Sequence, residues 1–150
     1  MAGTANRAGA RRADPPFALM PWVFAGGMLG APARYAVESA LPGVDGGFPV
    51  ATFTVNVVGA FVLGLVLESL ALAGPDAGIR KRLRLLIGTG FLGAFTTYSS
   101  FAVEINLLTT SDRMGVAAAY AASSLVVGLV SVALGIGAAH TARRRSEGVA

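Results

Sequence analysis

The sequence predicts an all-α integral membrane protein with four transmembrane helices, and two observations carry this prediction. First, hydrophobic residues make up 54% of the chain and charged residues only 13%, whereas soluble domains carry about 25% charged residues. Second, four long apolar stretches follow one another, separated by short polar connections. The length of 150 residues suits a single domain. Because the chain has no cysteine, disulfides, thiolate metal sites and cysteine catalysis are excluded.

Each apolar stretch is long enough to cross a bilayer, whose core of about 30 Å needs roughly 20 helical residues. The stretches cover residues 17–41, 48–72, 83–108 and 114–139. We therefore expect a transmembrane domain at 16–140, a disordered cytoplasmic tail at 1–15 and a basic cytoplasmic tail at 141–150. No cleavable signal peptide is expected, because a long polar segment precedes the first stretch and that stretch is too long for a signal core.

The basic residues predict the orientation of the chain in the membrane. With four crossings, the two termini and the connection between the second and third stretches share one side. That side carries ten of the twelve lysines and arginines: Arg7, Arg11, Arg12, Arg80, Lys81, Arg82, Arg84, Arg143, Arg144 and Arg145. The other side carries Arg113 alone, and Arg34 lies within the first stretch. This bias predicts a multi-pass protein of a bacterial plasma membrane with both termini in the cytoplasm, and no nucleic-acid partner.

The third stretch contains the segment GFLGAFTTYSSF at residues 90–101, which is rich in glycine and hydroxyl groups. Gly88, Gly90 and Gly93, followed by Thr96 and Thr97, predict a break in this helix, because glycine bends easily and threonine is a weak helix former. A broken membrane helix exposes free backbone groups that can bind ions. The alternative is that these small residues only permit close helix packing.

Three further polar residues interrupt the apolar stretches. Asn56 is either a clamp between helices or a hydrogen-bond donor in a pore, because a buried amide is costly unless it is bonded. Arg34 either extends to the membrane surface, pairs with a carboxylate or attracts anions. Glu104 is a candidate functional residue, since an intramembrane carboxylate is rare, or else a partner of Arg34.

Hydroxyl and aromatic side chains share helix faces in the last two stretches. Tyr98 and Phe101 are three residues apart, and Tyr120 and Ser124 are four apart. Together with Asn56 they offer hydrogen-bond donors and the positive edges of aromatic rings, with little fixed negative charge. This combination suits a small, hard anion that has lost its water.

Three motifs resemble the Fluc/CrcB family of fluoride channels. They are GGMLGAPARY at 26–35, TFTVNVVGAFVLG at 52–64 and GFLGAFTTYSSFAVE at 90–104. The resemblance covers roughly residues 20–140. It implies an antiparallel dimer with two fluoride pores, a third helix broken in mid-membrane, and passive export of cytoplasmic fluoride that limits its toxicity. It also implies that the protein is not an enzyme.

The resemblance also assigns roles to individual residues. The backbone carbonyls of Gly93 and Thr96 are expected to hold a structural Na⁺ at the dimer centre, which is not transported. Arg34 and Glu104 are expected to have supporting roles. The residues expected along the fluoride pore are Asn56, Tyr98, Ser99, Ser100, Phe101, Tyr120 and Ser124.

The chain departs from the family pattern at several places. The family segment TTFSTFS reads TTYSSFA here, so that Tyr98 replaces a phenylalanine and Ala102 replaces a serine. Gly128 stands where a third hydroxyl of the last helix is expected. The bias of basic residues further suggests that the chain inserts in one orientation only. We therefore favour pairing with a homologous subunit of opposite orientation over a homodimer.

Two other functions fit parts of the sequence. A small proton-coupled multidrug transporter would also have four spans and would use Glu104 as its proton site. That class places its carboxylate in the first span, where this chain has Glu38 near the end. A membrane subunit that only supports a partner protein is the third possibility.

Overall fold

The computed structural model describes residues 15–41, 43 and 47–148, and the regular secondary structure of this part of the chain is all helical. The expected tail at 1–15 lies, apart from Pro15, outside the described residues. The helical elements are η1 (Pro16–Leu19), α1 (Met20–Ala40), α2 (Val50–Leu72), α3 (Ile79–Leu83), η2 (Arg84–Leu92), α4 (Gly93–Phe95), α5 (Ser99–Thr110) and α6 (Met114–Glu147). The segment η2 is a π-helix that continues α3 into α4.

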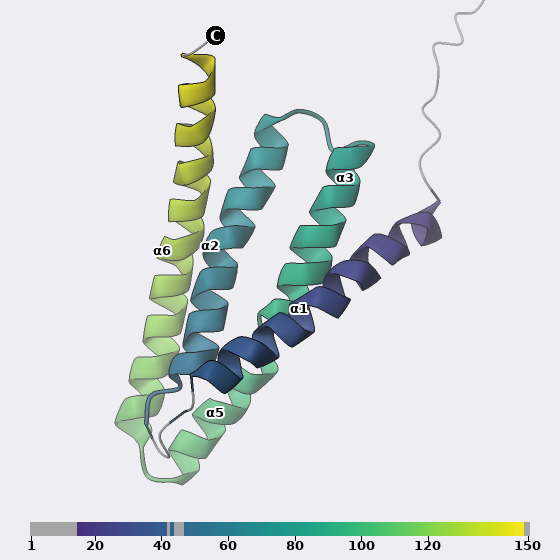
Figure 1. Ribbon diagram of the computed structural model, residues 1–150. Helices are drawn as coiled ribbons and strands as arrows, with labels where there is room; N and C mark the ends of the chain where they lie inside the picture. The colour runs from purple at the N-terminus through teal and green to yellow at the C-terminus, as the bar shows by residue number, and fades with distance from the viewer. Residues whose placement is uncertain (1–14, 42, 44–46, 149–150) are drawn as a thin grey trace, which may run out of the picture.

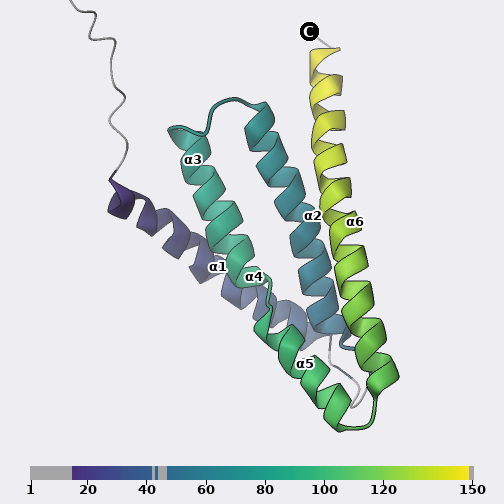
Figure 2. The same ribbon diagram turned by 180° about the vertical axis from the view of Figure 1, so that it is seen from behind.

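The helices form an elongated bundle in which α2, α6 and the α3–α5 segment run along the long axis, while α1 crosses them obliquely (Figures 1 and 2). The start of α1, the α2–α3 connection and the end of α6 lie at one end of the bundle. The α5–α6 turn lies at the other end. Successive elements therefore run back and forth along the bundle.

Three segments of the described chain are long and apolar enough to cross a membrane. They are Val50–Leu72, Ile79–Thr110 and Met114–Glu147, with mean hydropathies of 2.2, 1.2 and 2.0. They match the predicted second, third and fourth stretches. The first predicted stretch forms the 21-residue helix α1, but it is not among these segments, and its glycines, Arg34 and Glu38 make it less apolar. Its crossing of the membrane stays a prediction.

Glycines bring two pairs of helices into backbone contact. A Cβ on Gly30 would lie 2.1 Å from the carbonyl oxygen of Phe91, and one on Gly90 would lie 2.5 Å from that of Val23. These positions join α1 to η2. On α6, a Cβ on Gly135 would lie 2.2 Å from the carbonyl oxygen of Phe61 in α2. Of the two roles that the sequence left open for these glycines, Gly90 therefore has the role in close helix packing.

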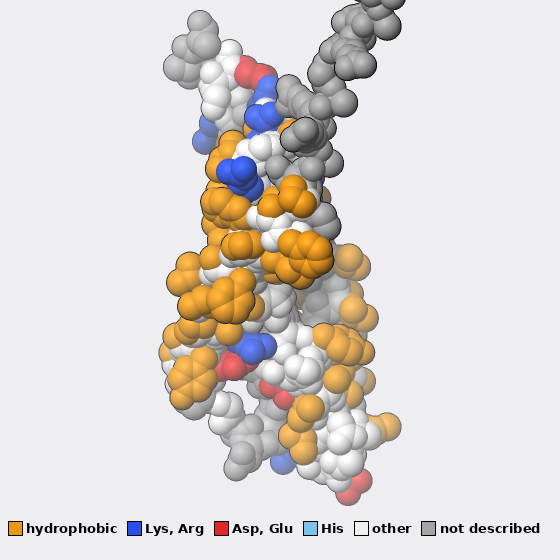
Figure 3. Space-filling model, turned by 90° about the vertical axis from the view of Figure 1, so that its right-hand side faces the viewer, with side chains coloured by type: hydrophobic (Ala, Val, Ile, Leu, Met, Phe, Trp, Pro, Cys, Tyr) orange, Lys and Arg blue, Asp and Glu red, His pale blue; other side chains and the backbone are white. Residues whose placement is uncertain are grey.

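The molecule exposes large apolar side chains over most of its length. For example, the side chains of Phe24, Tyr35, Leu125 and Leu129 are exposed by 70%, 73%, 66% and 69%. In Figure 3 apolar side chains cover the middle of the molecule and basic side chains gather at one end. Contiguous apolar surface of this kind needs a lipid or protein environment.

The last helix is longer than expected, because α6 continues to Glu147 through most of the predicted basic tail. Two contacts tie the C-terminal part of α6 to the end of α2. His140 Nε2 lies 3.0 Å from Glu68 Oε1, and the Arg143 guanidinium donates a hydrogen bond to the Leu72 carbonyl. The segment from 141 to 147 is thus a helical extension that contacts α2.

Candidate functional site

The third membrane segment is interrupted between α4 and α5. Helix α4 ends at Phe95, Thr96 adopts an extended conformation with φ −78° and ψ 159°, and α5 begins at Ser99. The predicted break is therefore present at residues 96–98. Gly88 and Gly90 lie before it, inside η2, so the loose backbone expected from these glycines does not form the break.

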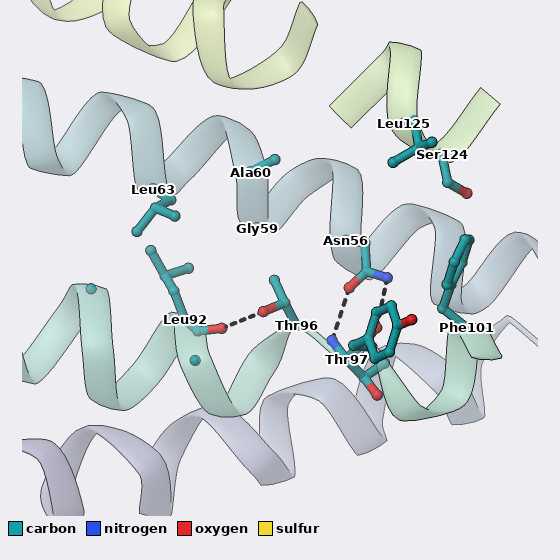
Figure 4. Close-up of a pocket in the computed structure, with 13 residues that line it drawn as sticks. Asn56, Gly59, Ala60, Leu63, Leu92, Thr96, Thr97, Phe101, Ser124 and Leu125 are labelled. Carbon is teal, nitrogen blue, oxygen red and sulfur yellow. Dashed lines mark hydrogen bonds between the residues drawn. The ribbon is translucent and has the colours of Figure 1, made fainter. Parts of the chain in front are cut away.

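Asn56 of α2 forms hydrogen bonds with both backbone polar groups of Thr97, a residue in the break. Its Nδ2 donates to the Thr97 carbonyl at 2.9 Å, and its Oδ1 accepts from the Thr97 N–H at 2.9 Å (Figure 4). Backbone groups at membrane depth must be bonded within the protein. Asn56 therefore acts as the interhelical clamp that the sequence left open, and one Nδ2 hydrogen remains for a second acceptor.

Thr97 also starts the helix that follows. Its Oγ1 accepts a hydrogen bond from the Ser100 N–H at 3.1 Å and donates to the Ser100 hydroxyl at 3.2 Å. The Ser99 hydroxyl lies 3.2 Å from the same Thr97 oxygen. Thr97 directly precedes Tyr98, the N-cap residue of α5, and its side chain thus binds an N–H group of the first turn. Thr97 thus fixes the first turn of α5 and contacts the hydroxyls of Ser99 and Ser100, two of the three predicted pore serines.

Several backbone carbonyls lose their helical partners at the break, and those of Gly93 and Thr96 are among them. In a continuous helix, Gly93 and Thr96 would accept hydrogen bonds from the N–H groups of Thr97 and Ser100. Here the Thr97 N–H binds Asn56, and the Ser100 N–H binds Thr97 Oγ1. Gly93 is exposed, with open space where a Cβ would stand. These are the two carbonyls that the resemblance assigned to Na⁺.

A cation at this position would depend on backbone oxygens. Among the described residues, no group of three or more His, Cys, Asp or Glu side chains could hold a metal ion. Free carbonyls at the end of a half-helix are suitable ligands for Na⁺. Two carbonyls from one chain are fewer ligands than a cation of this kind takes, so the remainder would come from water or another subunit.

A groove of about 440 Å³ opens beside the break between α2, η2 and α5. Four predicted site residues line it together with Gly93 and Thr96: Asn56, Tyr98, Phe101 and Ser124 (Figure 4). The Ser124 Oγ is buried without a hydrogen-bond partner in the described structure. Much of the apolar wall of the groove is formed by Leu63, Leu92 and Leu125. No lysine or arginine lines the groove.

Three aromatic rings extend from the groove into the protein. Tyr98 is 80% exposed, and its ring centroid lies 6.0 Å from that of Phe101. The Phe101 ring in turn lies 5.1 Å from the Tyr120 ring, which is fully buried. Phe101 is thus held between a ring at the surface and a ring in the core.

Glu104 joins three helices through hydrogen bonds to its two carboxylate oxygens. Thr52 of α2 donates to Oε1 at 2.6 Å, and the Tyr120 hydroxyl of α6 donates to Oε2 at 2.7 Å. In the described part of the chain, Glu104 forms no ion pair with Arg34. A second cavity of about 500 Å³ is lined by Glu104, Ser100 and Glu38.

The structure thus brings together part of the predicted set. Asn56, Tyr98, Phe101 and Ser124 line one groove, Ser100 lines the second cavity, and Ser99 binds Thr97. The Tyr120 hydroxyl is directed at Glu104, and Arg34 remains half-buried on α1. Sequence reasoning missed Thr52 and the hydrogen bond of Thr97 to the first turn of α5. A buried threonine facing Glu104 has no signal in a single sequence, whereas the T-x-x-S spacing could have indicated the hydrogen bond of Thr97.

Comparison with known proteins places the chain in a family. Residues 21–136 match the model of the "CrcB-like protein, Camphor Resistance (CrcB)" family. The chain is 49% identical over 124 residues to the fluoride-specific ion channel FluC 2 of Leifsonia xyli, covering 81% of this chain and 85% of that protein. It is 42% identical to the fluoride-specific ion channel FluC of Prosthecochloris aestuarii, covering 83% and 94%. It is 44% identical to FluC 1 of Cutibacterium acnes, covering 73% and 77%. These relatives are named as ion channels, and the family is one of channels, not of enzymes. Matches of this identity and coverage show that the chain belongs to the CrcB family.

Proposed function

We propose that this multi-pass membrane protein is a subunit of a fluoride-selective passive ion channel. The observation that carries the proposal is the groove at the break in the third membrane segment. It combines the spare Nδ2 hydrogen of Asn56, the unpartnered Ser124 hydroxyl and the Phe101 ring with apolar walls. The names of the three relatives support fluoride as the ion.

Selectivity would come from replacing the water around the ion. A narrow path must offer hydrogen-bond donors in place of the hydration shell, and it must do so without holding the ion too tightly. The amide, the hydroxyl and ring edges are neutral donors, so they provide moderate attraction. Because fluoride is strongly hydrated, losing one donor should reduce fluoride flux more than chloride flux.

The break itself would be stabilised by a structural Na⁺ that is not transported. The ion would be held by the Gly93 and Thr96 carbonyls, which have no helical partner, and it would supply positive charge that neutralises these carbonyl dipoles. Asn56 and Thr97 already satisfy the neighbouring backbone groups. The exposed position of Gly93 supports a further contribution from a second subunit.

The active form would be an antiparallel dimer. The exposure of Gly93 and Tyr98 beside the groove supports a partner that covers this face. The concentration of basic residues at one end would place both termini in the cytoplasm and favour a homologous partner of opposite orientation, although a homodimer is the alternative. Fluoride would then leave the cytoplasm down its own gradient.

A proton-coupled multidrug transporter that uses Glu104 is less consistent with the geometry. Both carboxylate oxygens of Glu104 accept hydrogen bonds from side chains of neighbouring helices. The described cavity beside it contains Glu38 and mainly small or aliphatic residues, and of the large aromatic residues that would bind a lipophilic drug it has only Phe48. A purely supporting membrane subunit would have no use for an unpartnered hydroxyl in a groove.

The test is fluoride efflux from liposomes, read with a fluoride electrode and compared with chloride efflux. The protein is reconstituted alone and after co-expression with a homologue of opposite charge bias. We expect rapid, fluoride-selective efflux in at least one preparation. Phe101→Ile and Ser124→Ala should reduce it at least about tenfold, which corresponds to about 1.4 kcal/mol.

Two matched substitutions outside the groove serve as controls. Phe17→Ile and Ser39→Ala change exposed residues of η1 and α1 and should leave the flux unchanged. Absence of fluoride efflux from both preparations would contradict the channel proposal, and normal flux in both groove variants would contradict the assignment of the pore.

A further inference from the structure

One end of the molecule carries a cluster of basic side chains, which we call the basic end. It consists of residues of α3 and of the end of α6: Arg80, Lys81, Arg82, Arg144 and Arg145. These elements lie at the same end of the bundle in Figure 2, where α2 also ends. Figure 3 shows basic side chains gathered there above the apolar middle of the molecule.

The carboxylates of this region already have partners. Asp76 binds Arg84 at 2.9 Å, Glu147 binds Arg143 at 2.7 Å, and Glu68 binds His140 at 3.0 Å. Among the described residues, none of the five cations of the basic end has a carboxylate within ion-pair distance. The basic end therefore carries positive charge that the described protein does not neutralise.

Arg82 is held at the junction of this charge with an apolar surface. Its guanidinium carbon lies 5.8 Å from the centroid of the Trp22 ring, in the first turn of α1. A stacked guanidinium keeps the N–H groups at its edge available for a phosphate. Around Trp22, the apolar side chains of Phe17, Met20 and Phe24 are exposed by 76%, 62% and 70%.

We propose that the basic end is a docking surface for anionic phospholipids, with one headgroup bound beside the Arg82–Trp22 pair. The lipid phosphate pairs with Arg82 and Lys81, and its acyl chains lie against the exposed apolar residues at the start of α1. Basic clusters next to membrane helices attract anionic lipids, and tryptophan is enriched at the depth of the headgroups. This inference does not depend on which ion the protein conducts.

A second copy of the chain in the same orientation fits this surface poorly. A copy in the same orientation would place another basic end beside this one, and like charges repel across an interface. A lipid phosphate brings negative charge together with apolar chains, which matches both parts of the surface. The charge therefore favours a lipid over a second copy in the same orientation as the occupant.

Trp22 makes the proposal directly testable, because it is the only tryptophan in the chain. The full-length protein is reconstituted in phosphatidylcholine vesicles that contain bromine-labelled phosphatidylglycerol or, at the same mole fraction, bromine-labelled phosphatidylcholine. Bromine quenches tryptophan fluorescence on contact. We expect at least about twofold stronger quenching by the anionic lipid, because one basic residue near the surface contributes a factor of about five in affinity.

Substitutions then identify the residues responsible. Lys81→Gln combined with Arg82→Gln should make the two lipids quench equally. Arg113→Gln, at the α5–α6 turn, should leave the difference unchanged. Equal quenching in the unaltered protein would overturn the proposal. It would also be overturned if neither lipid quenched Trp22, since another protein surface would then cover it, or if the double variant kept the full difference.

Discussion

Asn56 and Thr97, 41 positions apart in the chain, exchange two hydrogen bonds of 2.9 Å each. One amide side chain thus takes both the N–H and the C=O of a single residue, as a neighbouring peptide would. This pairing allows the third membrane segment to leave its helix at Thr96 without an unsatisfied group at Thr97. The pairing also fixes part of the groove wall, because Asn56 and Thr97 both line the groove.

Asn56→Asp should break this pairing on one side only. The carboxylate still accepts from the Thr97 N–H, but it faces the Thr97 carbonyl with an acceptor in place of a donor. An unsatisfied buried acceptor costs about 1–3 kcal/mol, and more when a charge is present. We expect a lower midpoint of thermal unfolding in detergent, and loss of fluoride flux in liposomes.

The matched control is Asn106→Asp, because Asn106 is an exposed asparagine on α5. It introduces the same charge away from the break and should change neither stability nor flux. If Asn56→Asp behaved like this control, the clamp would have no energetic role.

Thr97→Val should weaken the first turn of α5. Valine has nearly the same shape but cannot accept from the Ser100 N–H, and loss of a side-chain hydrogen bond at a helix start costs about 1 kcal/mol. Thr97→Ser keeps the hydroxyl and should stay close to the unaltered protein. Hydrogen exchange of the amides at the start of α5 reports the effect locally. Equal exchange in the valine and serine variants would show that this hydrogen bond does not stabilise the turn.

The helical fold could be read from the sequence because it rests on long-range averages of hydropathy. The stretches predicted at 48–72 and 114–139 appear as α2, which ends at Leu72, and α6, which begins at Met114. The extension of α6 to Glu147 was missed, because arginines in the last turns look like a tail although they also suit a helix C-terminus. The π-helix η2 was missed because its glycines looked like a flexible break, whereas Gly90 leaves room for the close contact of η2 with α1.

The groove could be predicted only in part. Asn56, Phe101 and Ser124 were found because polar or aromatic residues inside apolar stretches are conspicuous. The partners of Glu104 could not be found, since Thr52 lies 52 positions away and contacts it only after α2 and α5 pack. Hydrogen-bond partners depend on helix rotation and crossing, which a single sequence does not specify. The dimer, the Na⁺ and the path of the fluoride stay predictions.

Gly30→Ala should disrupt the crossing of α1 with η2. Its Cβ would lie 2.1 Å from the Phe91 carbonyl oxygen, so one backbone must move, and overpacking of this kind costs about 1–3 kcal/mol. Gly137→Ala is the control, because a Cβ there meets open space. The comparison is made by thermal unfolding in detergent. Equal unfolding temperatures would show that the crossing is looser than described.

Tyr120→Phe should separate a structural role of the tyrosine hydroxyl from a role in conduction. The sequence places this hydroxyl on the fluoride path, whereas the structure directs it to Glu104 at 2.7 Å. Removal of the hydroxyl leaves Glu104 Oε2 without this donor inside the protein, and a hydrogen bond to a charged group contributes about 1.5–3 kcal/mol. We expect a clear loss of thermal stability with an unchanged ratio of fluoride to chloride flux. Tyr35→Phe, on a side chain that is 73% exposed, should change neither quantity. A fall in the ratio of fluoride to chloride flux without a loss of stability would contradict this structural role. It would indicate that the Tyr120 hydroxyl contacts the ion in the pore and favours fluoride there.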